Sequence, residues 1–401
     1  MSEVLPFCSD MSVLNQSLAV GTHTLKNRLV IQPMEGCDGT LDGTPDELTI
    51  RRYRRFAESG AGLIWFEAVA IVHDGRASPR QLYINENNVN AYTRLLTEIR
   101  EISLKETGIN PLIIMQATHS GRYSKPTPVI ARNNPLFEGE TPLPKECIIA
   151  DDELKALEER FLIAAKLAHK AGFDGVDIKS CHGYLLSELL ASHTRSGLYG
   201  GSFDNRTRLM RNAIEAVRSN LPDAFIVTSR MNIYDAYAYP FGFGAAEGGG
   251  TQPDLTEPIR LLEILNLPII NITMGNPYQN PRVNRPCDTE AVERMCSLTR
   301  QIQTAFPSMA VVASGVSFLR ERSGELVAGY IESDVCRLVG FGRMAFAYPH
   351  FARDILSGNF NKKMTCVTCG NCSRLMRAGQ PSGCAVRDEP YRKLFREHCK
   401  S

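Results

Sequence analysis

The stretch DGVDIKSCHGYLLSELLASHTRSGLYGGSFDNR, residues 174–206, decides the fold of this chain. It opens with the apolar run GVDI at 175–178, which is typical of a buried parallel strand. Three polar residues follow closely, namely Lys179, His182 and Tyr184. Because α/β barrels place their chemistry at the C-terminal ends of their strands, the stretch predicts that these three side chains enter one pocket.

Similar apolar runs recur along the chain, with amphipathic helical patterns between them. The candidate strands are residues 28–31, 62–69, 111–117, 175–179, 225–230, 268–273, 310–313 and 335–339. The helix expected at 151–171 has Asp151 as its N-cap and Gly172 as its C-cap. Eight strands alternating with helices predict an α/β fold, the (β/α)8 TIM barrel. A doubly wound open sheet is the alternative, but residues 32–36, QPMEG, are not the Gly-rich phosphate loop it needs.

Composition limits the class of protein. The 401 residues are 43% hydrophobic and 22% charged with net charge +1, which is ordinary for a globular protein and favours neither nucleic acid nor an anionic membrane surface as partner. No apolar run approaches the roughly 20 residues that span a bilayer. The N-terminus lacks the pattern of a signal peptide, and twelve cysteines in a chain this long suggest a reducing compartment, so we expect a cytoplasmic protein.

Two segments of the chain interrupt or extend the barrel pattern. Residues 119–149 and 232–253 are long connections that follow predicted strands, and such loops are often lids over an active site. From residue 361 the chain becomes basic and rich in cysteine. We therefore expect a barrel over residues 1–360 and a short Cys-rich extension over residues 361–401.

Four cysteines of this extension have the spacing C-x2-C-x2-C-x11-C, namely Cys366, Cys369, Cys372 and Cys384. Thiolates so spaced in a reducing compartment are typical metal ligands. Three cysteines two residues apart favour a [4Fe–4S] cluster, because one compact loop can wrap a face of the cubane. Structural zinc sites more often use two separated C-x2-C pairs, so zinc is the alternative, followed by thiols without metal.

The central stretch resembles the Old Yellow Enzyme family, whose pattern runs roughly G-F-D-G-V-E-I-H-x-A-[HN]-G-Y-L-L-x-x-F-L and then Y-G-G-S-x-x-N-R. Further motifs in the expected order extend the resemblance over most of residues 20–357. The position of the cysteine loop is similar to that in the iron–sulfur branch of the family, typified by trimethylamine dehydrogenase and 2,4-dienoyl-CoA reductase. That branch usually continues into further domains, which this chain, ending at Ser401, does not include.

The resemblance implies a binding site for flavin mononucleotide (FMN). Gln116 would offer hydrogen bonds to the pyrimidine edge of the ring, and Arg230 would place positive charge near N1 and O2. Glycines after the last two strands, with Arg343, would hold the phosphate. The full set that the resemblance implies is Pro33, Met34, Glu35, Ala68, Gln116, Arg230, Ser314, Gly315, Gly342 and Arg343.

Two residues depart from the family pattern. Glu35 stands where a Thr or Cys commonly bonds to the flavin, and its carboxylate would either face the ring or pair with an arginine. Lys179 stands where a His is usual, and it would either hold a substrate oxygen or pair with Asp177 or Glu35.

The reaction that the resemblance implies is reduction of the C=C bond of an α,β-unsaturated carbonyl compound. Reduced flavin gives a hydride to the β-carbon, Tyr184 gives a proton to the α-carbon, and Lys179 with His182 holds the carbonyl oxygen. Electrons would come from NAD(P)H directly or from a redox partner protein through the cluster, and we expect a homo-oligomer. Oxidation of a small amine, an electron-transfer subunit and a structural barrel with a zinc tail are the alternatives.

Overall fold

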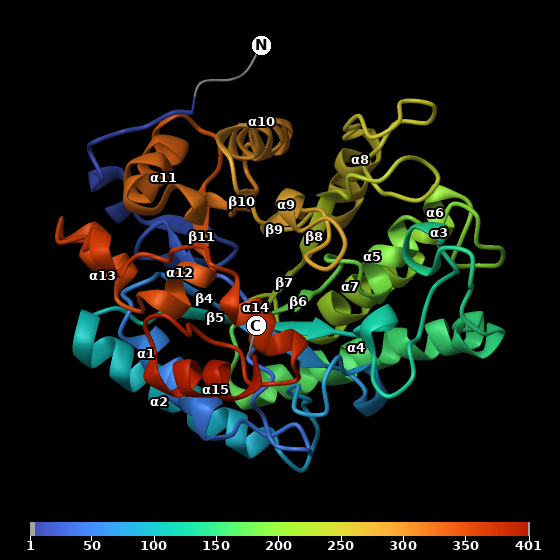
Figure 1. The fold of residues 1–401 in the computed structure, drawn as a ribbon, viewed down its shortest axis with the longest axis horizontal. Helices are drawn as coiled ribbons and strands as arrows, with labels where there is room; N and C mark the ends of the chain where they lie inside the picture. The colour runs from blue at the N-terminus through green and yellow to red at the C-terminus, as the bar shows by residue number, and fades with distance from the viewer. Residues whose placement is uncertain (1–4, 400–401) are drawn as a thin grey trace.

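The computed structural model describes residues 5–399, and its main sheet consists of parallel strands (Figure 1). Their order in the sheet is β7-β6-β5-β4-β3-β11-β10-β9-β8. The strands are β3 (Leu29–Ile31), β4 (Leu63–Ala70), β5 (Leu112–Thr118), β6 (Gly175–Ile178), β7 (Ile226–Thr228), β8 (Arg230–Tyr234), β9 (Ile269–Met274), β10 (Ala310–Ala313) and β11 (Leu338–Phe341).

The sheet closes into a barrel because β7 and β8 are two halves of one barrel strand, separated at Ser229. The first half pairs with β6 and the second with β9, and Ser180 forms a bridge with Met231 across the junction. The two halves together occupy the place of the strand predicted at 225–230, so the TIM barrel prediction is confirmed. The last predicted strand was placed too early, because the N–H of Val335 bonds to Tyr330 O at 2.8 Å and the strand begins only at Leu338.

Helices follow the strands in turn and surround the barrel (Figure 1). The longer ones are α1 (Glu47–Ala57), α2 (Val89–Thr107), α4 (Asp151–Ala171), α7 (Arg208–Asn220), α8 (Thr256–Leu265), α10 (Thr289–Ala305), α11 (Ser323–Glu332) and α15 (Glu389–His398). The short ones are α3 (Pro135–Glu138), α5 (Leu185–Leu190), α6 (Phe203–Arg206), α9 (Pro281–Asn284), α12 (Arg343–Ala347), α13 (Phe351–Leu356) and α14 (Asn371–Arg377).

Helix α4 has the predicted bounds, but only one of its two predicted caps. Gly172 ends it in the left-handed conformation at φ 99°, as expected. Asp151 is not the N-cap, because the helix is capped at Ala150, whose N–H donates to the Glu153 carboxylate at 2.8 Å. The carboxylate of Asp151 instead pairs with Arg195 at 2.7 Å.

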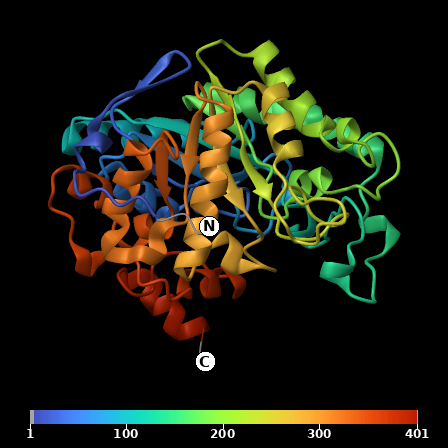
Figure 2. The ribbon, with the colours of Figure 1, turned by 90° about the horizontal axis from the view of Figure 1, so that it is seen from above.

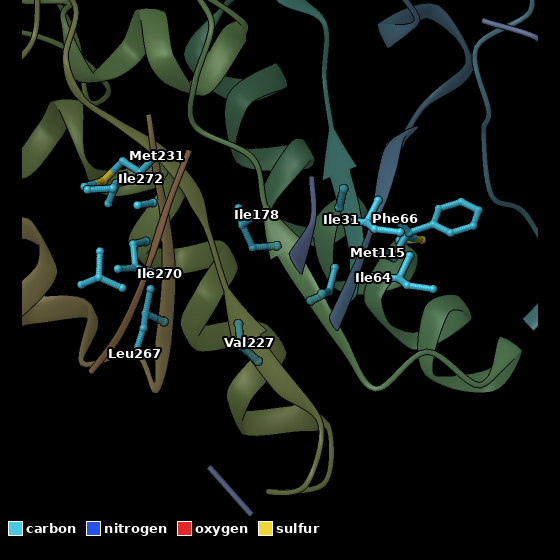
Figure 3. Close-up of a cluster of buried hydrophobic side chains, with 14 of the residues drawn as sticks. Ile31, Ile64, Phe66, Met115, Ile178, Val227, Met231, Leu267, Ile270 and Ile272 are labelled. Carbon is cyan, nitrogen blue, oxygen red and sulfur yellow. The ribbon is translucent and has the colours of Figure 1, made fainter. Parts of the chain in front are cut away.

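The barrel has an apolar core on each face of its sheet. Inside, residues such as Val30, Trp65 and Val312 pack under a small hairpin that the sequence analysis missed, formed by β1 (Leu18–Val20) and β2 (His23–Leu25). Outside, a larger cluster fills the space between the strands and the helices. Figure 3 shows the strand side chains of this outer cluster, including Ile64 and Met115. With both faces buried, the strands are nearly continuous apolar runs, which is why the sequence pattern located them.

The Cys-rich extension packs on the barrel at the edge opposite the hairpin (Figure 2). Asp388 accepts hydrogen bonds from Arg51 of α1 and forms a second ion pair with Arg55. The N–H of Ser382 donates to Gly36 O at 2.7 Å, which joins the extension to the loop after β3. None of the helices in residues 5–399 is long and apolar enough to cross a membrane.

Candidate functional site

One pocket, with an empty volume of about 1110 Å³, lies where the barrel strands end. Every residue that the sequence analysis assigned to catalysis or to flavin binding lines it. These residues are Pro33, Met34, Glu35, Ala68, Gln116, Lys179, His182, Tyr184, Arg230, Ser314, Gly315, Gly342 and Arg343.

The turn after β6 brings three of these side chains together. Lys179 follows the last residue of the strand, and His182 and Gly183 then adopt left-handed conformations at φ 65° and 72°. A left-handed conformation is uncommon for a residue other than glycine, and it often marks a functional site. The sharp turn ends at Tyr184, the N-cap position of α5, so all three side chains face the same pocket.

The hydroxyl of Tyr184 lies in a small polar cluster. It donates to the Glu35 carboxylate at 3.2 Å and shares a hydrogen bond of 3.3 Å with the hydroxyl of Tyr278. Burial and the nearby Glu35 raise the pKa of Tyr184 well above its usual value, so the phenol keeps its proton at neutral pH. Within residues 5–399 the Glu35 carboxylate forms no ion pair with an arginine and contacts this tyrosine, a partner that the sequence did not indicate.

Lys179 approaches the same tyrosine from its face. Its Nζ lies 3.7 Å from the centre of the Tyr184 ring, in a cation–π contact. Within residues 5–399 no hydrogen bond or salt bridge joins Lys179 to Asp177 or Glu35, although both carboxylates act on it electrostatically. Burial is the largest influence on this lysine and lowers its pKa.

A buried carboxylate, Asp177, organises the base of the pocket. It accepts hydrogen bonds from Trp65 Nε1 at 2.7 Å, Gln116 Nε2 at 2.6 Å and the backbone N–H of Arg230 at 2.6 Å. Burial raises the pKa of Asp177 to about 6, even though these donors oppose the shift. Gln116 gives one N–H of its amide to Asp177, so its second N–H and its oxygen are left for a ligand.

The polar atoms of the pocket fit a flavin. Gln32 Nε2, His182 Nε2 and Arg230 Nε are buried and have no hydrogen-bond partner within residues 5–399, although buried polar atoms in proteins are nearly always paired. Gly342 also lines the pocket, and a Cβ on it would lie 2.6 Å from Met34 Sδ, so a side chain here would displace Met34. The donors and the glycine therefore suit a planar, hydrogen-bonding ring with a phosphate tail.

Several pocket residues were missed because they come from the loop after β9 or from the Cys-rich extension, which the barrel pattern does not cover. Tyr278 and Arg285 follow β9, while Ser373 and Arg377 come from α14 of the Cys-rich extension. Arg285 joins the two segments by donating to Ser373 Oγ at 2.5 Å and to Pro277 O at 2.8 Å. The basic residues of the Cys-rich extension were only a weak indication of pocket residues, because nothing in the sequence shows that the extension reaches the pocket.

Further tyrosines gather at and beside the pocket. Tyr278 lies 4.0 Å from Tyr123 between ring centres, and Tyr123 lies 5.6 Å from Tyr184. Tyr237 instead packs on Phe137 in a separate small cavity. No residue of the two long connections appears in the lining of the large pocket, so within residues 5–399 they contribute only the nearby Tyr123.

The four cysteines of the predicted cluster line a second cavity of about 370 Å³ next to the first. Cys372 and Arg343 line both cavities. Burial raises the pKa of Cys384, and the neighbouring Cys372 and Cys369 add to this rise, so the sulfur atoms are close enough to interact. Among residues 5–399, however, no group of three or more His, Cys, Asp or Glu side chains is placed to hold a metal ion.

Known proteins resemble this chain in sequence. Residues 14–360 match the family model described as the NADH:flavin oxidoreductase / NADH oxidase family. An NADPH dehydrogenase from Clostridium acetobutylicum is 33% identical over 258 residues, which are 63% of this chain and 70% of that protein. Other curated relatives are matched over only 52% and 56% of their length.

Two solved structures share the fold. A 2-naphthoyl-CoA reductase in complex with 2-naphthoyl-CoA has a TM-score of 0.80 and 18% identity, and the match covers 96% of this chain and 58% of that one. An Old Yellow Enzyme homologue from Zymomonas mobilis has a TM-score of 0.66 and 21% identity, over 86% of this chain and 92% of that one.

The chain belongs to the NADH:flavin oxidoreductase / NADH oxidase family, as its central stretch predicted. It is therefore an oxidoreductase of a family that uses FMN and NAD(P)H.

Proposed function

We propose that this protein is an FMN-dependent ene-reductase, which reduces the C=C bond of an α,β-unsaturated carbonyl compound. The observation that carries the proposal is the convergence of Tyr184, Lys179 and His182 on the pocket that also contains the expected flavin-binding residues. Gln116 and Arg230 would hold the pyrimidine edge of the flavin, and Gly315, Gly342 and Arg343 its phosphate. A bound, reduced flavin supplies the hydride that the β-carbon of the alkene takes up.

The residues of this chain supply the rest of the reaction. The Tyr184 phenol, which is protonated at neutral pH, gives a proton to the α-carbon. Lys179 and His182 line the pocket, and His182 Nε2 has no hydrogen-bond partner within the described residues, so both are available to hold the carbonyl oxygen as negative charge develops on it. Burial lowers the pKa of His182 well below its usual value, so it acts as a neutral hydrogen-bond donor.

We further propose that residues 361–401 form a unit that binds a [4Fe–4S] cluster through Cys366, Cys369, Cys372 and Cys384. The four thiols line one cavity, and Cys372 also lines the large pocket, which favours electron transfer between the two sites. The cluster would pass electrons from a redox partner protein to the flavin, while NAD(P)H is the alternative donor.

The pocket lining argues against amine oxidation and against a subunit that only transfers electrons. Four arginines and Lys179 line it, together with one carboxylate, Glu35, so it suits an anionic or polarised substrate better than a small ammonium ion; the arginines are Arg230, Arg285, Arg343 and Arg377. A subunit that only transfers electrons would not need a phenol and two oxygen-binding groups facing the ring site.

An anaerobic absorption spectrum with an iron and zinc assay tests the cofactors. We expect flavin bands over a broad brown shoulder and about four iron atoms per flavin. Flavin with zinc and no iron would reject the cluster and leave NAD(P)H as donor, whereas absence of flavin would reject the whole proposal. The activity test mixes the dithionite-reduced protein with cyclohex-2-en-1-one, which should reoxidise the flavin and yield cyclohexanone, whereas trimethylamine should not reduce the oxidised protein.

A further inference from the structure

We propose that Glu35 is a proton-relay residue that returns a proton to Tyr184 as Tyr184 gives its own proton to the substrate. This inference rests on the proposed ene-reductase function and deepens it. It starts from the departure noted in the sequence, since a carboxylate stands here where a Thr or Cys is common, and from the position that the structure gives to that carboxylate.

The geometry places Glu35 beside the catalytic phenol, in the lining of the same pocket. Its Oε2 lies 3.2 Å from the hydroxyl of Tyr184, which is itself only 2% exposed. Glu35 is half-buried and lines the pocket. Tyr184 therefore has little access to water of its own, whereas Glu35 can exchange protons with the solvent of the pocket and is in direct hydrogen-bond contact with the phenol.

A relay avoids a costly pair of charges. If Tyr184 gave up its proton while Glu35 stayed ionised, a phenolate and a carboxylate would lie 3.2 Å apart in a buried site. Two like charges at this distance cannot both persist at low cost, so one of them takes up a proton. Proton uptake by Glu35 removes this charge repulsion. The hydrogen bond between the two oxygen atoms then reverses, with Glu35 as donor and Tyr184 as acceptor.

The charged and titratable groups around Glu35 come from several elements. Lys179, after β6, is the cation that acts on it, and the thiol of Cys37 donates to its Oε1 at 3.4 Å. Tyr278, from the loop after β9, is electrostatically coupled to it. The next residue, Gly36, is held on both sides, because its N–H donates to Glu67 at 2.7 Å and its carbonyl accepts from Ser382 at 2.7 Å. The backbone therefore fixes Glu35 in contact with Tyr184.

In this step the π bond of the alkene breaks, the β-carbon gains the hydride that reduced flavin supplies, and the α-carbon gains the phenolic proton of Tyr184. Glu35 begins as the carboxylate that accepts from Tyr184. It takes a proton from water in the pocket and passes it to the Tyr184 oxygen, where a new O–H bond forms, and the water regains its proton from solvent. Tyr184 ends neutral and Glu35 ends as a carboxylate, as each began.

The test measures reoxidation of the reduced holoenzyme by cyclohex-2-en-1-one in wild type, Glu35→Gln and Glu35→Asp, with Glu86→Gln as the control that removes one surface carboxylate. We expect Glu35→Gln to be about ten to a hundred times slower, within the usual range for assisted proton transfer. In mixtures of H2O and D2O, a plot of the wild-type rate against the deuterium fraction of the solvent should be curved, because two protons move in one step. The same plot should be a straight line for Glu35→Gln and curved again for Glu35→Asp.

A second readout does not depend on turnover. In holoenzyme labelled with [13C]tyrosine, the ring resonance of Tyr184, assigned with Tyr184→Phe, should titrate at lower pH in Glu35→Gln, because the carboxylate raises the pKa of this phenol.

Two failures can be told apart. If the enone does not reoxidise the reduced wild type, the proposed ene-reductase function is wrong, whatever the titration shows. If the wild type reacts but Glu35→Gln has the same rate and a curved dependence on D2O, or Glu35→Asp gives a straight line, the relay is wrong and the ene-reductase function stands.

Discussion

The ammonium nitrogen of Lys179 lies 3.7 Å from the centre of the Tyr184 ring, so the pocket places a buried cation on the face of the proposed acid. Both residues come from the turn after β6, and Glu35 contacts the same phenol through its hydroxyl. One phenol thus has a cation on its face and a carboxylate at its oxygen. Both neighbours can therefore influence how readily Tyr184 gives up its proton.

Replacement of Tyr184 by Phe should remove the proton donor and leave the flavin site intact. We expect the reoxidation of reduced protein by cyclohex-2-en-1-one to slow by about 10²- to 10⁴-fold, the usual contribution of a general acid. Flavin content and the rate of reduction by dithionite should not change. Stopped-flow absorbance measures both half-reactions, and Tyr199→Phe, which removes a hydroxyl that donates to Glu158, is the control. Equal reoxidation rates in wild type and Tyr184→Phe would contradict the assignment.

Replacement of Lys179 by Met should slow reoxidation by about 10²-fold, the usual cost of losing one donor to a developing oxyanion. It should also change how stability depends on pH. Burial lowers the pKa of Lys179, so the unfolded chain binds more protons than the folded one between the folded and unfolded pKa values, and wild-type stability rises with pH through that window.

The increase of the unfolding free energy with pH should be smaller in Lys179→Met than in wild type, as measured by urea unfolding at several pH values from 7 to 10. Lys166→Met, at an exposed position of α4, is the control. A pH dependence in Lys179→Met identical to that of wild type would show that the lysine is not the buried cation described here.

Replacement of Asp177 by Asn should loosen the base of the pocket. The new amide would turn an N–H2 group toward donors from Trp65, Gln116 and Arg230, so at least one of them loses its acceptor. We expect a loss of about 1–3 kcal/mol in unfolding free energy at pH 7, because a buried donor is left unpaired. We also expect weaker FMN binding, since Gln116 loses the bond that orients its amide.

The pH dependence has a definite sign. Burial raises the pKa of Asp177 to about 6 from 3.8, so its contribution favours folding below pH 3.8 and is lost as pH rises to about 6. Calorimetry between pH 4 and 6.5 should show that this contribution is absent in Asp177→Asn. Unchanged FMN affinity in that variant would contradict the role given to Gln116.

Replacement of Cys369 by Ser should remove iron and the brown shoulder while the flavin bands remain. The cysteine lies in the cavity of the proposed cluster and contributes one thiolate ligand. Cys287→Ser is the matched control, because Cys287 is also exposed but lies outside this cavity. Iron and flavin assays on the same samples decide the outcome, and full iron content in Cys369→Ser would reject this ligand.

Replacement of Asp388 by Asn should loosen the Cys-rich extension. Asp388 is 4% exposed and pairs with Arg51 and Arg55, which are partly exposed. We expect a loss of about 1–3 kcal/mol in unfolding free energy, the range for hydrogen bonds that involve a charged group. Proteolysis within residues 361–399 should become faster. Glu389→Gln, which removes an exposed pair with Arg392, should change stability by less than about 1 kcal/mol, and equal effects of the two variants would contradict this docking role.

The residues proposed from sequence line one pocket, and most of them follow regular elements. Lys179 and Arg230 are at or next to strands buried on both faces, whose apolar runs are easy to recognise. Sequence reasoning failed at Tyr278 and Arg285, which lie in an irregular segment after β9 where no periodic pattern marks a residue as buried or as facing the pocket. The predicted N-cap role of Asp151 was also wrong. The helix is capped at Ala150, and the Asp151 carboxylate accepts a hydrogen bond from Arg195, which lies far away in the sequence.

The sequence by itself determined the barrel, because strands buried on both faces are visible in the local periodicity of the chain. It also supplied the proposed flavin-binding residues, through resemblance to a family, and the proposed cysteine ligands, through their spacing. Only the tertiary structure decided what the two unusual residues do: Glu35 contacts Tyr184 across 149 positions of sequence, and Lys179 covers its ring. It also decided that Ser382 and Cys372 of the extension reach the pocket. Such contacts depend on which side chains meet when the barrel closes, and no local pattern of residues encodes that meeting.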